Sequence, residues 1–398
     1  MTQQGKDSAA IQLGRREFAK GLAMVGTAGA LGGALRAGPV AAQASPPAPV
    51  GNGGAPVTYV AAVPKRVVVP KTIAGVPKMI DMNRDLAVHP GFNTDSNFMV
   101  CNLKAQDGRE FQIMLHQMCV NPDKRPGDFP LILSIVTFAD RSGKRYWQKE
   151  NNYFGKDFSV SAERMDIKTP TSGIVGDKDT MKLWADLPDG EGRFEISVKR
   201  TGPILYNCST GEFPFLSSQV RVWHFAIPTM EAGGSLTLDG KTIPVSGTAW
   251  FDRQWNDMPA DFFEKRTKWK WMNLSLDNGY RISVWDTTVD GKTENAWATV
   301  VSPDGAHLIA DMIPLSQHES DVWKSPVTGQ SYPTRYKVVL PALNTSIDVK
   351  VWDGLPQQEI VSPSGDNKYE AACTCKGTFM GKPVKGFNCV ELVGNFLA

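Results

Sequence analysis

From residue 80 onward, apolar and polar residues alternate along short segments that are rich in Val, Ile, Thr, Phe, Tyr and Trp. Strict alternation places successive side chains on opposite faces of a β-strand. Amphipathic helix patterns are scarce, and turn pairs that favour antiparallel hairpins separate the segments. These turns are Asp107-Gly108, Ser142-Gly143, Asp189-Gly190, Asp239-Gly240, Asp277-Asn278-Gly279, Asp290-Gly291, Asp304-Gly305 and Asp353-Gly354. The pattern predicts an all-β protein of antiparallel sandwiches or closed barrels, with a lipocalin-like interior as a natural place for apolar cargo.

The stretch 245–255 is rich in aromatic side chains and follows the predicted hairpin turn at 239–240. Alternation predicts that Trp250 and Asp252 share one face of this strand, with Arg253 on the opposite face. A carboxyl group beside an aromatic residue on an inward face is a candidate proton donor with a raised pKa. The alternative is a structural Asp252–Arg253 pair that closes the rim of a barrel.

Two sections repeat the same hairpin pattern. Residues 98–115 and residues 269–284 each contain a strand, an Asp-Gly or Asp-x-Gly turn and a returning strand. Together with the length of the chain, this repetition suggests two similar β-barrels. We expect the first barrel to comprise residues 76–232 and the second to comprise residues 233–398.

The first 44 residues have the organisation of an export signal. Residues 14–20, which include Arg15-Arg16, resemble the twin-arginine consensus, and a Gly/Ala-rich apolar segment and a small-x-small cleavage site at 42–44 follow. Glycine interrupts the apolar segment too often for a stable membrane span of ~20 residues. The alternative is a basic amphipathic helix. We expect a signal peptide over residues 1–44 and a mature protein that is periplasmic or secreted, exported by the twin-arginine machinery.

Residues 45–75 are rich in Pro, Gly, Ala and Val, which predicts an extended leader with an edge strand near residues 65–69. The formal net charge is +2 and the charges are spread along the chain, so no basic footprint for nucleic acid is visible. No apolar run is long enough to predict a transmembrane segment in the mature chain.

The chain has six cysteines, and the expected compartment permits disulfides. Cys373, Cys375 and Cys389 lack the usual metal-ligand spacing and have no neighbouring histidine in the sequence, so we expect no metal site there. A bridge from Cys375 or Cys373 to Cys389 across a C-terminal hairpin is the favoured pairing. Some of the six cysteines are alternatively just buried thiols.

The residues also carry a family resemblance. Residues 234–255, followed by Trp269-Lys-Trp271 and residues 276–279, resemble the AttH-like family of bacterial secreted proteins, which is related to carotenoid 1,2-hydratase. The Trp-x-Asp-Arg motif at 250–253 is the most specific part, and residues 201–206 and 222–228 agree with the family in order and spacing. The resemblance covers most of residues 80–310.

The resemblance implies two lipocalin-like antiparallel β-barrels packed together, with the ligand site at or near their junction. In the carotenoid hydratase branch, the proposed chemistry is protonation of an isolated alkene by an aspartic acid and capture of the carbocation by water, without a cofactor. Transferred to this chain, Asp252 is the acid and Trp250 its aromatic companion, while His224 lies beside Trp223 on the preceding strand. Such an acid needs an apolar, water-poor site to stay protonated, and aromatic faces stabilise a cation by ~2 kcal/mol each when desolvated.

One departure from the family concerns the first domain. Where the family usually has Glu-Trp-Trp-Tyr, this chain has Asp95-Ser96-Asn97-Phe98. The acid and the last aromatic residue remain, as Asp95 and Phe98, and two small polar residues replace the tryptophans. If the family signature shapes the ligand pocket, the pocket of this chain is roomier and more polar.

Each further candidate has a structural alternative. His224 is either a catalytic residue or a satisfied core histidine, and Arg253 either contacts the substrate or holds the motif strand in place. Trp271, on the same strand face as Trp269, is a substrate-binding candidate or a core residue. His89 precedes Pro-Gly and is more typical of a loop than of a site.

These residues lead to two functional hypotheses. The first is an exported protein that binds or acts on an apolar, isoprenoid- or lipid-like molecule, by cofactor-independent hydration of an alkene or by an isomerase- or cyclase-like step. Asp252 and His224 would be catalytic, and Trp250, Asp95, Trp223, Phe98, Arg253 and Trp271 would line the pocket. The second is a non-catalytic periplasmic carrier of a hydrophobic ligand. No serine-hydrolase, Walker, Rossmann or zinc-protease motif is present in the sequence.

Overall fold

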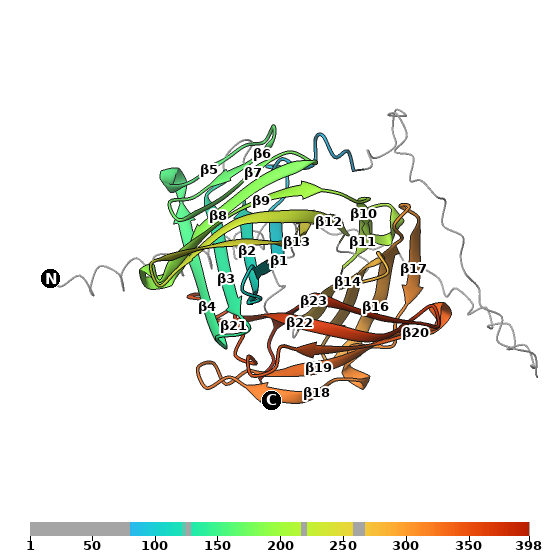
Figure 1. Cartoon of the computed structure of the whole chain (residues 1–398). Helices are drawn as coiled ribbons and strands as arrows, with labels where there is room; N and C mark the ends of the chain where they lie inside the picture. Colours follow the sequence, from blue (N-terminus) through green and yellow to red (C-terminus); the bar gives the residue numbers. More distant parts are fainter. Residues whose placement is uncertain (1–79, 122, 124–128, 216–220, 258–266, 398) are drawn as a thin grey trace, which may run out of the picture.

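A computed structural model describes residues 80–121, 123, 129–215, 221–257 and 267–397, so the predicted signal and leader segments lie outside the described residues. The described chain forms two curled antiparallel sheets, as the alternating pattern predicts, and Figure 1 shows one sheet above the other. In the described part, the helical elements are short 3-10 turns: η2 (Gly155–Asp157), η3 (Pro188–Gly190), η4 (Asn207–Ser209), η5 (Leu315–Gln317) and η6 (Pro341–Leu343).

The first sheet contains 13 strands, in the order β4-β3-β2-β1-β13-β12-β9-β8-β7-β6-β5, with β10 and β11 paired to β12. Its strands are β1 (Thr94–Ala105), β2 (Glu110–Val120), β3 (Leu131–Asp140), β4 (Arg145–Phe154), β5 (Ser159–Val160), β6 (Met165–Lys168), β7 (Ser172–Gly176), β8 (Thr180–Asp186), β9 (Gly192–Arg200), β10 (Leu205–Tyr206), β11 (Glu212–Pro214), β12 (Arg221–Leu238) and β13 (Lys241–Asn256). The predicted turn between β12 and β13 is present, with positive φ at Asp239 and Gly240, as a tight hairpin requires.

The second sheet contains 10 strands, in the order β17-β16-β15-β14-β23-β22-β20-β19-β18, with β21 paired to β22. Its strands are β14 (Thr267–Leu276), β15 (Arg281–Val289), β16 (Lys292–Val301), β17 (His307–Asp311), β18 (Ser320–Lys324), β19 (Ser331–Leu340), β20 (Thr345–Val351), β21 (Glu359–Ile360), β22 (Lys368–Phe379) and β23 (Lys382–Gly394). From β17 to β18 this order corresponds to the order from β4 to β7 in the first sheet, with β14 in the place of β1 and β23 in the place of β13, and β6 and β5 extend the first sheet further. The two hairpins whose sequences looked alike, β1–β2 and β14–β15, are therefore equivalent in topology.

The change from one sheet to the other falls later than the sequence suggested. The expected boundary at 232/233 lies inside β12, which pairs with β13 along its length, and both strands belong to the first sheet. The first strand of the second sheet begins at Thr267. The two glycines at this position, Gly233 and Gly234, lie within the strand and not in a linker. A Cβ at Gly234 would meet the carbonyl oxygen of Glu195 at 2.1 Å, so the close approach of two backbones requires glycine there.

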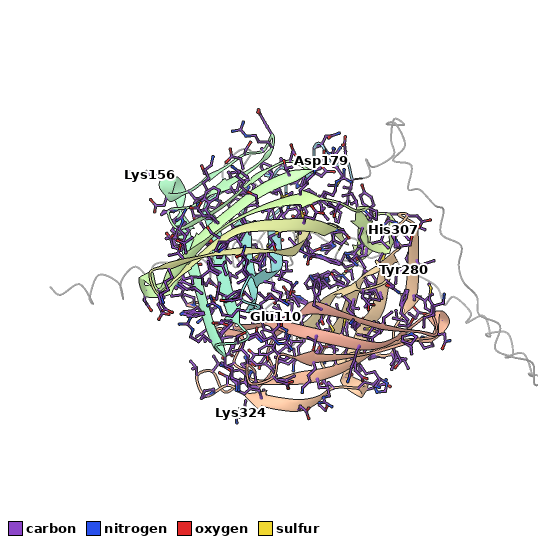
Figure 2. The ribbon with its side chains drawn as sticks, viewed as in Figure 1. Glu110, Lys156, Asp179, Tyr280, His307 and Lys324 are labelled. Carbon is purple, nitrogen blue, oxygen red and sulfur yellow. The ribbon has the colours of Figure 1, made fainter. Side chains whose placement is uncertain are left out.

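Three large apolar clusters, beside a smaller one around Trp352, make up the buried core of the described residues. The first core fills the concave side of the first sheet and includes Met99, Phe138, Phe194 and Phe251. The second core fills the concave side of the second sheet, and its largest members are the buried tyrosines Tyr332, Tyr336 and Tyr369. The third, here called the interface cluster, joins the outer faces of both sheets: Phe98, Val100, Met114, Ile135, Leu205, Phe213, Phe215, Val222, Ala226, Trp250, Trp271, Trp285, Trp297, Val301, Ile360 and Cys389. Side chains from both sheets fill the space between them (Figure 2).

The predicted disulfides are absent, because all six cysteines are free thiols. Directly opposed residues of β22 and β23 share a face, and Cys389 is opposed to Ala372, while Cys373 is opposed to Asn388. Cys373 and Cys375 therefore point into the second core, whereas Cys389 points into the interface cluster. Strand alternation places the two proposed partners of Cys389 on the opposite face of the hairpin.

No helix within the described residues is long and apolar enough to cross a membrane. In the same part of the chain, no group of three or more His, Cys, Asp or Glu side chains is arranged to hold a metal ion.

Candidate active site

The motif strand β13 presents different residues to the first core and to the interface between the sheets. Phe251 and Trp255 pack in the first core, and Trp250 packs in the interface cluster. Asp252 therefore lies on the interface face with Trp250, and Arg253 lies on the concave face, as alternation predicts. The alternative of an Asp252–Arg253 pair does not hold. Arg253 is paired with Asp95 on the concave face, and Asp252 lies on the opposite face of the strand.

Asp252 is paired with His224 across two neighbouring strands. The Oδ1 atom of Asp252 lies 3.3 Å from Nε2 of His224, and the two side chains are 5% and 2% exposed. The side-chain amide of Asn207, in η4, donates a hydrogen bond to Nδ1 of His224. An acceptor at Nδ1 leaves the proton of a neutral imidazole on Nε2, where it faces Asp252. Asn207 is thus hydrogen-bonded to His224, and His224 in turn lies at ion-pair distance from Asp252, in one buried row of polar side chains.

The surroundings of Asp252 favour its protonated form. Burial raises the pKa of this carboxyl, the charge and hydrogen bond of His224 oppose that rise, and the charge of Glu391 on the second sheet adds to it. The net shift is upward from the ordinary value of 3.8. A carboxylic acid with a raised pKa in a water-poor interface is a group that can hold a proton and donate it.

Aromatic rings of both sheets surround this acid. The ring of Trp271 lies 5.5 Å from that of Phe98 and 6.4 Å from those of Trp250 and Trp285, centroid to centroid. The Trp285 ring also makes an edge contact with His224 at 5.7 Å. The structure therefore brings together five of the predicted site residues: Asp252, His224, Trp250, Phe98 and Trp271.

The replacement of the family's two tryptophans affects the site in only one place. Ser96 shares the face of Phe98, and its hydroxyl lies 2.8 Å from Nε2 of the buried His116. Burial lowers the pKa of His116 well below its usual value, so this histidine is neutral. Asn97 instead shares the concave face with Arg253, its directly opposed residue on β13. The loss of bulk at the interface is therefore confined to Ser96.

The structure does not bring Trp223 into this site. Trp223 is directly opposed to Trp255 on β13, packs beside the first core and lies 5.2 Å from the ring of Phe92. It points away from Asp252 because neighbouring residues of a strand face opposite sides, and His224 is the residue of this pair that faces the interface.

Asp95 and Arg253, two further predicted pocket residues, form a buried ion pair on the concave side of the first sheet. Nη1 of Arg253 lies 2.7 Å from Oδ1 of Asp95, both side chains are 0% exposed, and Nη2 donates to Oδ2 at 2.8 Å. Backbone carbonyls of Leu86, Ala87 and Ser96 accept the remaining guanidinium protons. This pair anchors the segment before β1 to the first sheet and does not contact the interface.

His89 belongs to the same internal cluster. Its Nδ1 lies 3.0 Å from Asp95 and its Nε2 lies 3.1 Å from Asp85, while its ring stacks on Trp255 at 4.2 Å. Burial of Asp95 would raise its pKa, but the charge of Arg253 and the hydrogen bonds from His89 and Arg253 outweigh burial and hold the pKa below its ordinary value. The ionised form of Asp95 is therefore favoured, and the pKa values of Asp95 and Asp252 are shifted in opposite directions.

Several residues at the interface carry no motif in the sequence. Asn207 lies in an irregular segment, where Cys208 and Ser209 adopt left-handed backbone conformations with φ of 50° and 68°. This segment is tied to the second sheet, because the backbone N–H of Cys208 donates to Thr299 and that of Tyr206 donates to His307, which Figure 2 labels at the edge of the second sheet. The hydrogen bond from Asn207 to His224 is visible only in the folded structure, where this segment is held between the two sheets.

The fold and the site define a class: a double-sheet, lipocalin-like β-protein with a buried acid at the junction of its sheets. The AttH-like family model matches residues 74–395, and the chain belongs to this family. An AttH protein from Nitrosomonas europaea superimposes with a TM-score of 0.68 at 19% identity, over 82% of this chain and 99% of that chain. Kievitone hydratase from Nectria haematococca gives a TM-score of 0.65 at 20% identity, over 79% of this chain and 93% of that chain. No curated protein matches the sequence.

Removing Arg253 should destabilise the protein strongly, because Asp95 would remain buried without its cation. For Arg253→Gln we expect a loss of about 3–5 kcal/mol in the free energy of unfolding. Arg335→Gln is the matched control, because Arg335 pairs with Asp321 at the surface and such pairs contribute about 0–1 kcal/mol. Urea unfolding measures both, and equal, small losses in the two variants would contradict the assignment.

The two acids should give opposite pH dependences. Because the folded pKa of Asp252 is raised, its proton stabilises the fold below about pH 3.8, and this stabilisation is lost as pH rises through the folded pKa. The stability of Asp252→Asn relative to wild type should therefore increase with pH above 3.8. Asp95 has a lowered pKa, so the stabilisation that it gives the fold above 3.8 is lost as pH falls from that value through its folded pKa. Asp95→Asn should therefore become less stable relative to wild type as pH rises toward 3.8, and the difference should stay constant above that value. Unfolding in urea from about pH 2 to about pH 8 tests both variants. A relative stability of Asp252→Asn that does not rise above pH 3.8, or an Asp95→Asn effect that grows only above it, would contradict the assignment.

Proposed function

We propose that this protein catalyses a cofactor-independent, acid-catalysed addition of water to an alkene of an apolar, isoprenoid- or lipid-like molecule. The observation that carries the proposal is the raised pKa of Asp252, a buried carboxyl that shares its strand face with an aromatic interface. An alkene is a weak base, so the acid that protonates it must be protonated at working pH and shielded from water.

In this mechanism, the protonated oxygen of Asp252 transfers its proton to one alkene carbon and leaves a tertiary carbocation on the other. His224 faces the second oxygen of Asp252 and stabilises the carboxylate that forms. Asn207 holds the imidazole in the orientation that the transfer needs. Water then forms a C–O bond with the cationic carbon, and loss of one proton from the added water yields a tertiary alcohol.

The aromatic side chains have two functions in the proposal. The faces of Trp250, Trp271 and Trp285 stabilise a neighbouring cation by about 0.5–2 kcal/mol each. The same rings give the site its affinity for an apolar substrate. A protein named as a hydratase shares this fold, and that agreement supports the same class of reaction for this chain.

We also propose that residues 1–44 direct export by the twin-arginine machinery, which would make the mature chain periplasmic or secreted. The support is the twin-arginine sequence at 14–20 with the apolar segment and cleavage site behind it. Export of a folded chain agrees with six thiols that are free and mostly buried.

The proposal is tested by incubating the purified protein with a lipid extract of the source cells and analysing bound and released molecules by mass spectrometry. We expect a product heavier by one water with wild type, and at least a ~100-fold loss of that product with Asp252→Asn, since general acids typically contribute ~10²–10⁴-fold. Asp239→Asn makes the same chemical change at an exposed turn and should behave as wild type.

Two other results would replace the proposal. Recovery of an unchanged ligand that Asp252→Asn binds equally well would identify a carrier. A product of unchanged mass that depends on Asp252 would identify an isomerase- or cyclase-like enzyme, because protonation would then end in loss of a proton or ring closure.

A further inference from the structure

The second sheet presents its own carboxyl group to the interface, from the strand that corresponds to β13. β23 has the place in the second sheet that β13 has in the first, between the sheet's first strand and the neighbouring long strand. On β23, Glu391 is directly opposed to Trp271 of β14, so both side chains face the interface. The ring of Trp271 lies 6.4 Å from that of Trp250, which shares its strand face with Asp252, so Glu391 and Asp252 face the same interface from opposite sheets. The charge of Glu391 adds to the raised pKa of Asp252.

The carboxyl group of Glu391 accepts a hydrogen bond from a neighbouring tryptophan. Its Oε1 accepts a hydrogen bond from the indole Nε1–H of Trp269 at 2.6 Å. Donors that point at a carboxylate stabilise its ionised form. Glu391 is only partly buried, so water can reach it, whereas Asp252 is 5% exposed. The two acids of the interface therefore differ in their access to water.

A second carboxyl group lies directly beside Glu391. Glu370 of β22 is its cross-strand partner and is 2% exposed. Burial raises the pKa of Glu370 well above its usual value, and the charge of Glu391 and a hydrogen bond to it raise the pKa further. Burial thus favours the protonated form of Glu370, which can donate its proton toward Glu391, and the Oε1 atom of Glu370 has no hydrogen-bond partner among the described residues.

We propose that Glu391, supported by Glu370, is the general base that takes the proton of the water added in the reaction; this inference rests on the proposed function. The O–H bond of Asp252 breaks as a C–H bond forms on the alkene. A C–O bond then forms between water and the cationic carbon, and the proton released from that water passes to Glu391. Glu391 returns its proton to solvent and Asp252 takes one up, so alkene and water give an alcohol with no net change in the protein.

The other groups near Asp252 are poorly suited to this role. His224 is 2% exposed, and both of its ring nitrogens are occupied, Nε2 by Asp252 and Nδ1 by Asn207. Glu370 already bears a proton. Asp252 is a carboxylate after the transfer but lies on the first sheet, whereas Glu391 lies on the opposite side of the interface. An acid and a base on opposite sides of a substrate permit addition of a proton and of water to different faces.

Deuterium exchange separates the two proton transfers. With geranylgeraniol in detergent and D2O as solvent, Asp252 alone suffices to protonate the alkene, and a cation that finds no activated water loses a proton and returns as deuterated alkene. For Glu391→Gln we expect at least a ~100-fold loss of alcohol, with deuterium incorporation within a few-fold of wild type. Glu195→Gln, on an exposed side chain of the first sheet, is the matched control and should leave both unchanged.

Alcohol formation at the wild-type rate by Glu391→Gln would overturn the inference. Loss of both alcohol and exchange, in a variant that keeps the wild-type unfolding midpoint, would also overturn it, because Glu391 would then act on the protonation step. The absence of both exchange and alcohol with wild-type protein would instead count against the proposed function.

A measurement without substrate tests the shared proton directly. Infrared difference spectra at neutral pH between wild type and Glu370→Gln should show the loss of one protonated-carboxyl C=O band, and Glu391→Gln should shift that band because a neutral amide replaces the charged carboxylate beside Glu370. No band lost in Glu370→Gln would overturn the inference whatever the outcome with geranylgeraniol.

Discussion

Alternation along one strand, β13, is the constraint on which the structure depends. Successive side chains of a strand point to opposite faces, so the side chains of the motif lie in two separate buried clusters, the first core and the interface cluster. Arg253 enters the concave side of the first sheet, and Asp252 enters the junction of the two sheets. The raised pKa of Asp252 and the ion pair of Arg253 cannot be understood from the linear sequence of the motif, because these neighbouring residues belong to different sites.

The contrast between Asp95 and Asp252 shows how the environment assigns a function to the same chemical group. Both are almost completely buried, and burial alone favours the neutral acid in each. Asp95 has a fully buried guanidinium at 2.7 Å, whose charge outweighs burial. Asp252 has an imidazole at 3.3 Å and a second carboxyl group nearby, and burial prevails. The first arrangement suits a structural ion pair, and the second suits a proton donor.

The parts of the account that follow from local pattern were predictable from the sequence. Alternation and turn pairs predicted the strands and hairpins, the faces of Trp250 and Arg253, and, with the family resemblance, the doubled β-fold. The rest depends on contacts between distant segments. No local signal indicates that Arg253 pairs with Asp95, that Trp223 faces the first core, or that the first sheet continues to Asn256. Nor does any local signal indicate that Asn207 of η4 contacts His224 or that Glu391 of β23 faces the interface. The free thiols follow from the register of β22 and β23, which spacing alone does not specify.

If the proposed reaction takes place, it takes place at the junction of the two sheets and not inside a single barrel. A crystal structure of the wild-type chain with a bound branched tertiary alcohol, the expected type of product, distinguishes the two locations. We expect the hydroxyl group between Asp252 and Glu391, with the hydrocarbon against Trp271 and Trp285. An alcohol bound on the concave side of the first sheet, beside Asp95 and Arg253, would rule out a site at the junction.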